Sequence, residues 1–232
     1  MIVNNPPQAS LDPATGVVTV DSEASSQQLW ELGWFGKGTA SRMKPLCCSD
    51  SSDSSSYRIA RTEGRREPST KRMKSLSQVP IDVSESVQLS HCEAFYLAFI
   101  TRSIILTGIE GPSQCWECFS RVDQRFNVLM SAYYHFRSID NWAPKSGVKY
   151  GTDFMLYHPG PRHTHSAQAV IVVDEDRDQI TWADICQAVR NMNQVAKTVT
   201  IFSVQGVVNT LLQGQAPQAD VDCCQDTLVS LD

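Results

Sequence analysis

The sequence predicts a mixed α+β and α/β fold, in which a helical N-terminal layer precedes a small domain built on a mixed sheet. Apolar residues recur at helical spacing over residues 90–136, and over residues 144–206 the pattern changes to strand, strand, helix and strand. A stretch rich in Ser, Arg and Lys, and poor in large apolar residues, separates these parts from the N-terminal residues. We therefore expect two ordered regions joined by a poorly ordered one.

Five segments follow from these changes in composition. They are an N-terminal strand and helix segment (1–46), a disordered Ser-rich and basic linker (47–80), a helical region (81–143), the mixed-sheet domain (144–206) and an acidic, divergent tail (207–232). A length of 232 residues allows one or two domains.

The net charge of −5 is unevenly distributed. Residues 41–74 contain nine Lys and Arg against four Asp and Glu, or +5, so the rest of the chain sums to −10. This balance argues against broad non-specific nucleic-acid binding, but it allows a small basic site or positive surface supplied by other subunits. The basic part of the linker (61–74) is interpreted as solvated chain, with a nuclear-targeting patch or an RNA-contacting arm as alternatives.

The eight Cys predict free thiols in a reducing compartment, because the sequence shows no signal-peptide pattern and no apolar run near the ~20 residues of a membrane helix. Cys115 and Cys118 have the spacing of half a zinc site or of a redox pair. A second ligand pair of similar spacing is missing, since Cys47-Cys48 and Cys223-Cys224 are adjacent. Two thiols one helical turn apart are the favoured interpretation, and we expect no metal.

The first elements are a strand at residues 17–20 and a helix at 26–32 that ends near Gly33. The segment that follows, 34–42, contains Gly36, Gly38, Lys37 and Arg42. Such a loop can cradle a phosphate through backbone N–H groups, but glycines also serve tight turns, and we favour the turn.

The helical region begins at Ser90, which has the pattern of an N-cap with Glu93 in the capping-box position. Gly111-Pro112-Ser113 breaks the chain, and residues 115–136 then predict a further helix with apolar residues three and four apart. We interpret the aromatic residues of this region as core.

The mixed-sheet domain begins with an alternating strand at residues 149–157. A Pro- and Gly-containing loop (158–164) leads to an apolar strand at 167–173, followed by an acidic turn. Thr181 and Asp184 predict the start of a helix, and residues 198–204 a third strand. The predicted buried stripe of this helix is Ile185, Val189 and Met192.

Tyr157 ends the first of these strands, His165 precedes the second, and Lys197 lies where the helix leads into the third. If the three strands pair in one sheet, the three side chains meet near one of its ends. Such a trio suits RNA cleavage by the 2′-OH, which needs a base, an acid for the leaving 5′-oxygen and a cation for the phosphoryl charge. Taken alone, each residue is more often a packing or a solvated surface residue than a catalytic one. A Tyr of pKa ~10 is also a poor base unless positive charge lowers its pKa.

A family resemblance favours the catalytic interpretation. The sequence resembles the tRNA-splicing endonucleases in Tyr150-Gly151-Thr152-Asp153-Phe154-Met155-Leu156-Tyr157, in His165-Ser166, in the lead-in Phe136-Arg137-Ser138, Trp142 and 145–150, and in Val189-Arg190 followed by Lys197. A second resemblance, in 29–33, 35–38 and Ser41-Arg42, is to the N-terminal segment of the eukaryotic subunit that cuts the 5′ splice site.

The resemblance implies that residues 144–206 are a tRNA-intron-endonuclease catalytic domain, with Tyr157 as base, His165 as acid and Lys197 as transition-state stabiliser. It also implies metal-free cleavage of intron-containing pre-tRNA, leaving 2′,3′-cyclic phosphate and 5′-OH ends. The implied setting is a nuclear heterotetramer with a second catalytic subunit and two structural subunits. Arg190 is implied in binding RNA, but the Trp that partners this Arg in the family is absent, since Trp182 is the last Trp.

Three alternatives stay open. A scaffold subunit of the same complex would keep the fold without the trio. A metal-dependent nuclease of the restriction type would need an Asp/Glu-x-Lys strand motif, which the sequence lacks. A plain RNA-binding module would use Lys149, Arg162 and Arg190 as a basic patch.

Overall fold

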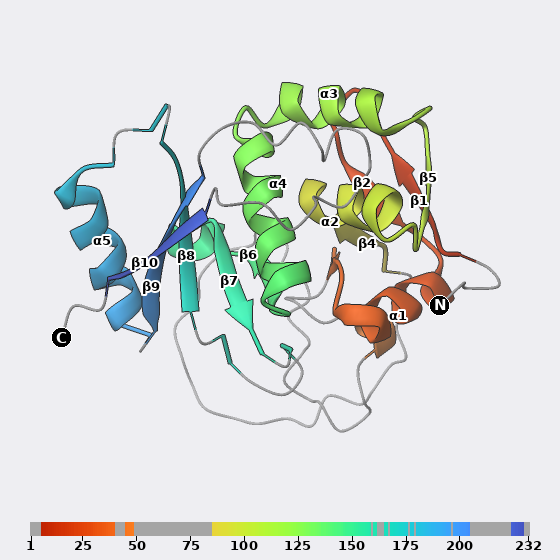
Figure 1. Cartoon of the computed structure of the whole chain (residues 1–232). Helices are drawn as coiled ribbons and strands as arrows, with labels where there is room; N and C mark the ends of the chain where they lie inside the picture. Colours follow the sequence, from red (N-terminus) through yellow and green to blue (C-terminus); the bar gives the residue numbers. More distant parts are fainter. Residues whose placement is uncertain are drawn as a thin grey trace, which may run out of the picture.

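The computed structural model describes residues 6–39, 45–48, 85–158, 160–161, 165–166, 168–175, 177–178, 180–195 and 197–204, and the backbone of 224–229. Within these residues the chain forms two five-stranded sheets, with helices packed between and around them (Figure 1). Most of the predicted linker and of the predicted tail lies outside the described residues.

The first sheet has the strand order β3-β4-β2-β1-β5. Its strands are β1 (Gln8–Leu11), β2 (Val18–Val20), β3 (Lys37–Gly38), β4 (Val87–Leu89) and β5 (Ile105–Thr107). The predicted strand at 17–20 is β2. The region predicted to be helical, 81–143, contains β4 and β5 of this sheet as well as helices, so it is not a purely helical layer. The missed strands are two to four residues long, too short for a periodic pattern. β4 and β5 pair with β1, β2 and β3, so the predicted boundary between the N-terminal segment and the helical region runs through one sheet.

Four helices precede the second sheet in the chain: α1 (Glu23–Gly33), α2 (His91–Phe95), α3 (Pro112–Val122) and α4 (Phe126–Tyr134). The predicted start at Ser90 is confirmed, because the Ser90 side chain accepts from the Glu93 N–H and the Glu93 side chain accepts from the Ser90 N–H. The helix predicted over 115–136 is two helices. Asp123 is extended (φ −128°, ψ 107°) and its Oδ1 accepts from the Arg125 N–H, which separates α3 from α4.

The second sheet has the order β10-β9-β8-β7-β6. Its strands are β6 (Ala143–Ser146), β7 (Phe154–Tyr157), β8 (Gln168–Asp174), β9 (Thr198–Val204) and β10 (Cys224–Val229). β8 and β9 are parallel and are joined through α5 (Trp182–Asn193), whose Thr181 and Asp184 form the predicted capping box. The predicted second and third strands and the buried positions Val189 and Met192 are therefore confirmed.

The strand predicted at residues 149–157 is shorter than expected, and β6 before it was not predicted. Val148–Tyr150 form a 3₁₀ turn, Gly151 has a positive φ of 74°, and the strand begins only at Phe154. All four residues of β7 are buried. The two faces of the strand belong to two different apolar clusters, with Phe154 in one and Tyr157 in the other.

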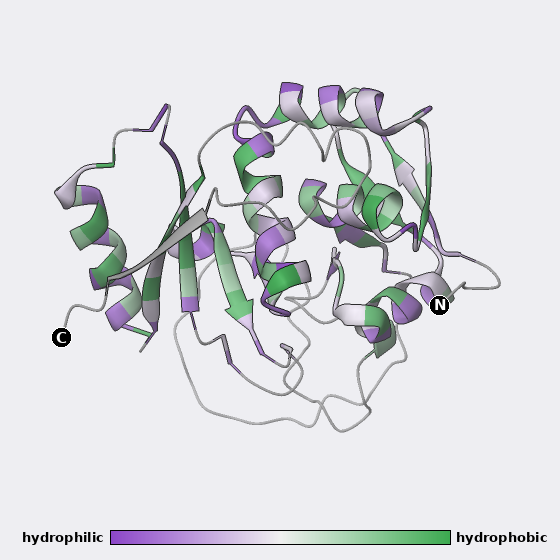
Figure 2. Cartoon of the chain, viewed as in Figure 1, coloured by the Kyte–Doolittle hydropathy of each residue, from purple (hydrophilic) through white to green (hydrophobic). Residues whose placement is uncertain are grey.

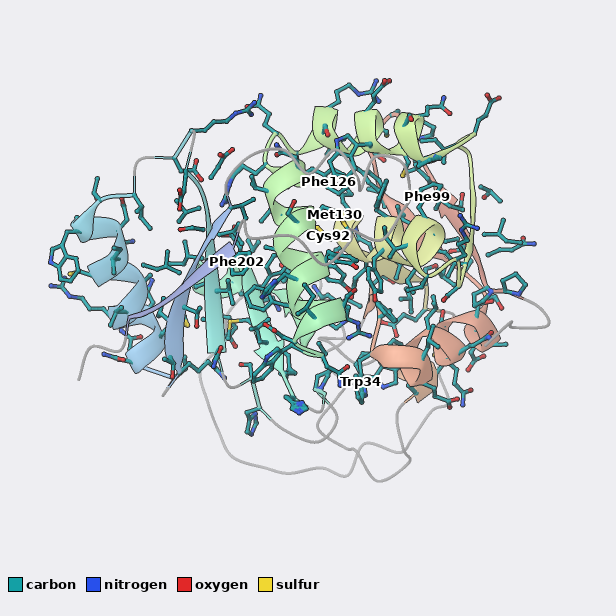
Figure 3. All side chains as sticks on the ribbon, viewed as in Figure 1. Trp34, Cys92, Phe99, Phe126, Met130 and Phe202 are labelled. Atoms are coloured by element: carbon teal, nitrogen blue, oxygen red, sulfur yellow. The ribbon has the colours of Figure 1, made fainter. Side chains whose placement is uncertain are left out.

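The larger apolar cluster spans both sheets, and Figure 2 shows hydrophobic residues concentrated between them. Figure 3 labels five of its residues, Cys92, Phe99, Phe126, Met130 and Phe202. The smaller cluster lies between the second sheet and α5, and α4 contacts the sheet at β8 and β9. The two parts of the chain therefore share one core. Within the described ranges, no helix is long and apolar enough to span a membrane.

Candidate active site at one end of the second sheet

The strand register places Tyr157 and Lys197 at the same end of the second sheet. Leu156 of β7 lies opposite Gln168 of β8, and Gln168 lies opposite Thr198 of β9. Tyr157 and Lys197 are each one residue beyond this row, so they flank the start of β8 from either side. The pairing of the three strands in one sheet, on which the expected meeting of the three side chains depends, is observed, and His165 lies three residues before the start of β8.

Ser166 joins the two side chains. Lys197 Nζ donates to the Ser166 carbonyl oxygen at 2.6 Å and also to Ser166 Oγ. The Ser166 side chain in turn hydrogen-bonds the Tyr157 phenol, and Ser166 is buried. Ser166 belongs to the His-Ser motif, but the motif alone predicts no function for it, so this connecting residue was missed.

His165 directly precedes this hydrogen-bonded serine and is exposed to solvent. Of the other loop histidines, His158 packs its ring 5.4 Å from that of Trp142, and His163 lies outside the described residues.

Burial raises the pKa of Tyr157, and the nearby Tyr150 adds to this, although the hydrogen bond with Ser166 opposes it. Burial also lowers the pKa of Lys197. The ammonium of Lys197 is directed at Ser166 rather than at the phenol. Tyr157 is therefore a neutral phenol at neutral pH in the substrate-free chain.

Arg190 lies in the last turn of α5 and is exposed, seven residues before Lys197. Trp182 is the first residue of the same helix and 64% exposed. Trp182 and Arg190 are eight positions apart, which corresponds to about 12 Å along the helix axis. Trp182 therefore does not replace the missing aromatic partner of Arg190.

The segment considered as a phosphate cradle is a turn. Gly36 has a φ of 78°, and its N–H donates to Glu93 Oε1 at 3.2 Å. The buried carboxylate of Glu93 thus already accepts from the Gly36 N–H, which a phosphate would need as a donor. Arg42 lies outside the described residues. The interpretation as a tight turn is confirmed at Gly36, whereas Gly38 lies in β3.

Cys115 and Cys118 are both buried in α3. Burial raises the pKa of the Cys115 thiol to about 12, and the Cys118 thiol donates to the Pro13 carbonyl oxygen at 3.6 Å. Both cysteines therefore act as packing residues, as the favoured interpretation predicted.

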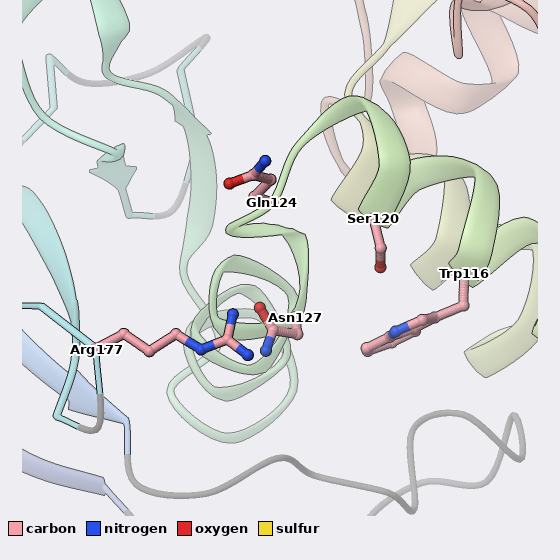
Figure 4. Close-up of a pocket in the computed structure, with 5 residues that line it drawn as sticks. All are labelled: Trp116, Ser120, Gln124, Asn127 and Arg177. Atoms are coloured by element: carbon pink, nitrogen blue, oxygen red, sulfur yellow. The ribbon is translucent and has the colours of Figure 1, made fainter.

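An open hollow of about 340 Å³ lies at the opposite end of β8 from Ser166. Figure 4 shows its lining, which comes from α3, α4, the segment between them and the turn after β8: Trp116, Ser120, Gln124, Asn127 and Arg177. None of the predicted site residues borders it.

Comparison with known proteins identifies the domain that carries this site. Residues 126–209 match the family described as tRNA intron endonuclease, catalytic C-terminal domain. This part of the chain is thus similar to a tRNA intron endonuclease catalytic domain. The matched segment begins with α4 and includes Tyr157, His165, Arg190 and Lys197.

The chain is also homologous to Sen2 subunits of tRNA-splicing endonuclease. It is 37% identical to subunit Sen2-1 of Arabidopsis thaliana over 131 residues, which cover 53% of this chain and 54% of that protein. It is 33% identical to subunit Sen2 of Rattus norvegicus over 132 residues (53% and 28%) and 42% identical to subunit SEN2 of Eremothecium gossypii over 105 residues (42% and 28%). The chain thus spans about half, or less, of the length of these relatives.

Proposed function

We propose that this chain is a catalytic subunit of a tRNA-splicing endonuclease and cuts pre-tRNA at the 5′ exon–intron junction. The hydrogen-bonded chain Lys197–Ser166–Tyr157, with the exposed His165 next to Ser166 in the sequence, carries the proposal. The endonuclease domain match and the similarity to Sen2 subunits support it. Choice of the 5′ junction rests on the resemblance of the segment after α1 to the 5′-cutting subunit.

The proposed reaction is an in-line transfer at phosphorus. The 2′-oxygen forms a bond to phosphorus as it loses its proton, and the bond from phosphorus to the 5′-oxygen breaks as that oxygen gains one. The products are a 2′,3′-cyclic phosphate and a 5′-OH. Lys197, held by Ser166, stabilises the negative charge that grows on the phosphoryl oxygens, so the reaction needs no metal.

The family resemblance gives Tyr157 as base and His165 as acid. The raised pKa of Tyr157 favours the reverse, because a neutral phenol donates a proton more readily than it accepts one. A substrate with a 5′-thio leaving group separates the two, since a thiolate leaves without an acid. If Tyr157 is the acid, this substrate restores cleavage by Tyr157→Phe; if Tyr157 is the base, the variant stays slow.

The proposed assembly is a nuclear heterotetramer, in which this chain works with a second catalytic subunit and two structural subunits. Arg190 is proposed to contact the RNA near the cut. Its exposure and its place on α5, seven residues before Lys197, support that role.

The test is cleavage of an intron-containing pre-tRNA in EDTA by the reconstituted complex, with wild-type chain and with His165→Ala. We expect the variant to lose the 5′ cut and keep the 3′ cut. Normal cutting at both sites by the variant would instead favour a scaffold subunit. Strict dependence on magnesium would favour a metal-dependent nuclease, and binding of pre-tRNA by wild type without any cut would favour an RNA-binding module.

A further inference from the structure

Resting on this proposed function, we propose that Trp34 is a positioning residue for the active site, seated against Gly160 in the loop between Tyr157 and His165. This gives the N-terminal segment a direct part in the geometry of the endonuclease domain. Trp34 lies at the end of α1, as labelled in Figure 3.

The indole of Trp34 lies face-on against the Gly160 backbone. A Cβ added to Gly160 would lie 2.5–2.6 Å from three ring carbons of Trp34, Cε2, Cδ2 and Cε3. Only a glycine fits at this distance. Trp34 also packs against the apolar cluster that contains Met155 and Tyr157, so one side chain contacts both that cluster and the loop that follows Tyr157.

The backbone of Trp34 is fixed in a conformation that bulky residues rarely adopt. Its φ of 59° and ψ of 33° are left-handed, the usual place for a glycine after a helix. The Trp34 N–H donates to the Trp30 carbonyl oxygen at 2.7 Å, and the Phe35 N–H donates to the Leu29 carbonyl oxygen. A tryptophan in this left-handed conformation points to a function of the ring.

Arg137 links the end of α1, next to Trp34, to Trp142, whose indole contacts the same loop. Its guanidinium donates to the Gly33 carbonyl oxygen at 2.7 Å and to the Trp142 carbonyl oxygen at 3.4 Å. The ring of Trp142 packs against His158, so two indoles contact the loop near its beginning, at His158 and Gly160. Both indoles belong to segments outside the catalytic strands.

The expected effect is on the rate of cleavage rather than on binding. His165 reaches the substrate from the far end of this loop, and a displacement of about 1 Å in a catalytic group costs roughly 100-fold in rate. We expect Trp34→Gly to lower the single-turnover rate constant of the 5′ cut by about 10- to 100-fold, with little change in KM for pre-tRNA. Glycine keeps the left-handed turn, so this variant removes the ring without straining the backbone.

The experiment uses the reconstituted complex with Trp34→Gly, Trp34→Phe, Gly160→Ala and the double variant Gly160→Ala/Trp34→Gly. Leu32→Ala, an exposed change in the same helix, is the matched control and should cut like wild type. We expect Trp34→Phe to retain more activity than Trp34→Gly. Gly160→Ala should be slow because its methyl group meets the indole, and the double variant should be faster than Gly160→Ala because the ring is gone.

Hydrogen exchange of a peptide covering residues 158–166 provides a readout besides activity. Trp34→Gly should speed exchange there and leave β8 and β9 unchanged. A wild-type rate and exchange in Trp34→Gly would overturn the proposal, as would equal slowing of the 5′ and 3′ cuts with loss of thermal stability. The proposed function fails separately, if His165→Ala leaves the 5′ cut intact.

Discussion

Lys145 Nζ lies 2.7 Å from Glu93 Oε1, and both side chains are almost fully buried. Lys145 Nζ also donates to the Gly36 carbonyl oxygen at 3.1 Å, so this ion pair joins β6 to α2 and to the turn after α1. Burial opposes ionisation, but the charge of Lys145 and several N–H donors hold the pKa of Glu93 below its usual value. The pair therefore stays ionised at neutral pH.

Replacing Lys145 by Met should destabilise the chain strongly. The change leaves the Glu93 carboxylate buried without its cation, which costs about 3–5 kcal/mol. At roughly 2–4 °C per kcal/mol for a chain of this size, Tm should fall by about 10 °C in a thermal melt. The matched control is Glu93→Gln/Lys145→Met, which should recover much of the loss. An unchanged Tm in Lys145→Met would contradict the assignment.

Ser166→Ala should slow cleavage more than it affects folding. The variant keeps the carbonyl contact to Lys197 but removes the hydroxyl that joins Lys197 to Tyr157. A hydrogen bond to a charged group contributes about 1.5–3 kcal/mol, or roughly 10- to 100-fold in rate. Single-turnover cleavage in EDTA measures this rate. Ser166→Thr keeps a hydroxyl, so its rate should lie between those of wild type and Ser166→Ala. Equal rates for wild type and Ser166→Ala would show that the hydroxyl is not used.

Asp153 belongs to the motif around Tyr157, yet its contacts are structural. Its Oδ1 accepts from Arg125 at 2.8 Å, and its Oδ2 accepts from the Val172 N–H at 2.7 Å. Asp153→Asn turns an amide toward one of these donors, so stability should fall by about 1–3 kcal/mol in urea unfolding. The cleavage rate of the folded variant should stay within a few-fold of wild type. Glu31→Gln, which removes an exposed charge, is the control, and a large loss of rate in Asp153→Asn would indicate a direct function.

Stability should fall as the pH drops below about 6.5 because of His91. Its ring stacks on Phe119 at 4.6 Å and its Nε2 lies 3.1 Å from the Gly16 carbonyl oxygen. Burial lowers the pKa of His91, although the Gly16 carbonyl and Asp123 oppose this. The unfolded chain therefore takes up the proton first, and stability present above pH 6.5 is lost as the pH falls toward the lower folded pKa.

The measurement is urea unfolding of wild type and His91→Gln between pH 7.5 and 5.5. Glutamine keeps a donor for Gly16 and does not titrate. Its stability should change less over this range than that of wild type, and parallel curves would exclude His91 as the cause.

The elements predicted correctly are those set by local chemistry. The capping boxes of α2 and α5 need only residues three apart, and β8 and β9 are apolar runs long enough to recognise. β1 and β5 could not be predicted in the same way. They pair in parallel although most of the first sheet and α2 lie between them in the sequence, and β5 buries little of its surface.

Within the site, the meeting of Tyr157 and Lys197 followed from where strands end. The contact through Ser166 did not, because it depends on the direction of a carbonyl group and on one side-chain rotamer. The contact of Trp34 with Gly160 depends on the packing of α1 against a distant loop. Short motifs identify residues at an active site, but tertiary packing decides which other segments hold them.

The core that both sheets share bears on the order in which the two sheets fold during synthesis of the chain. The described pairings of the first sheet are complete once residue 107 has been synthesised, before any strand of the second sheet exists. A polypeptide leaving the ribosome can thus form an apolar surface that includes Phe95, against which Phe126 packs later. A fragment that starts at Phe126 would lack that surface and expose its apolar face, so it should be prone to aggregation.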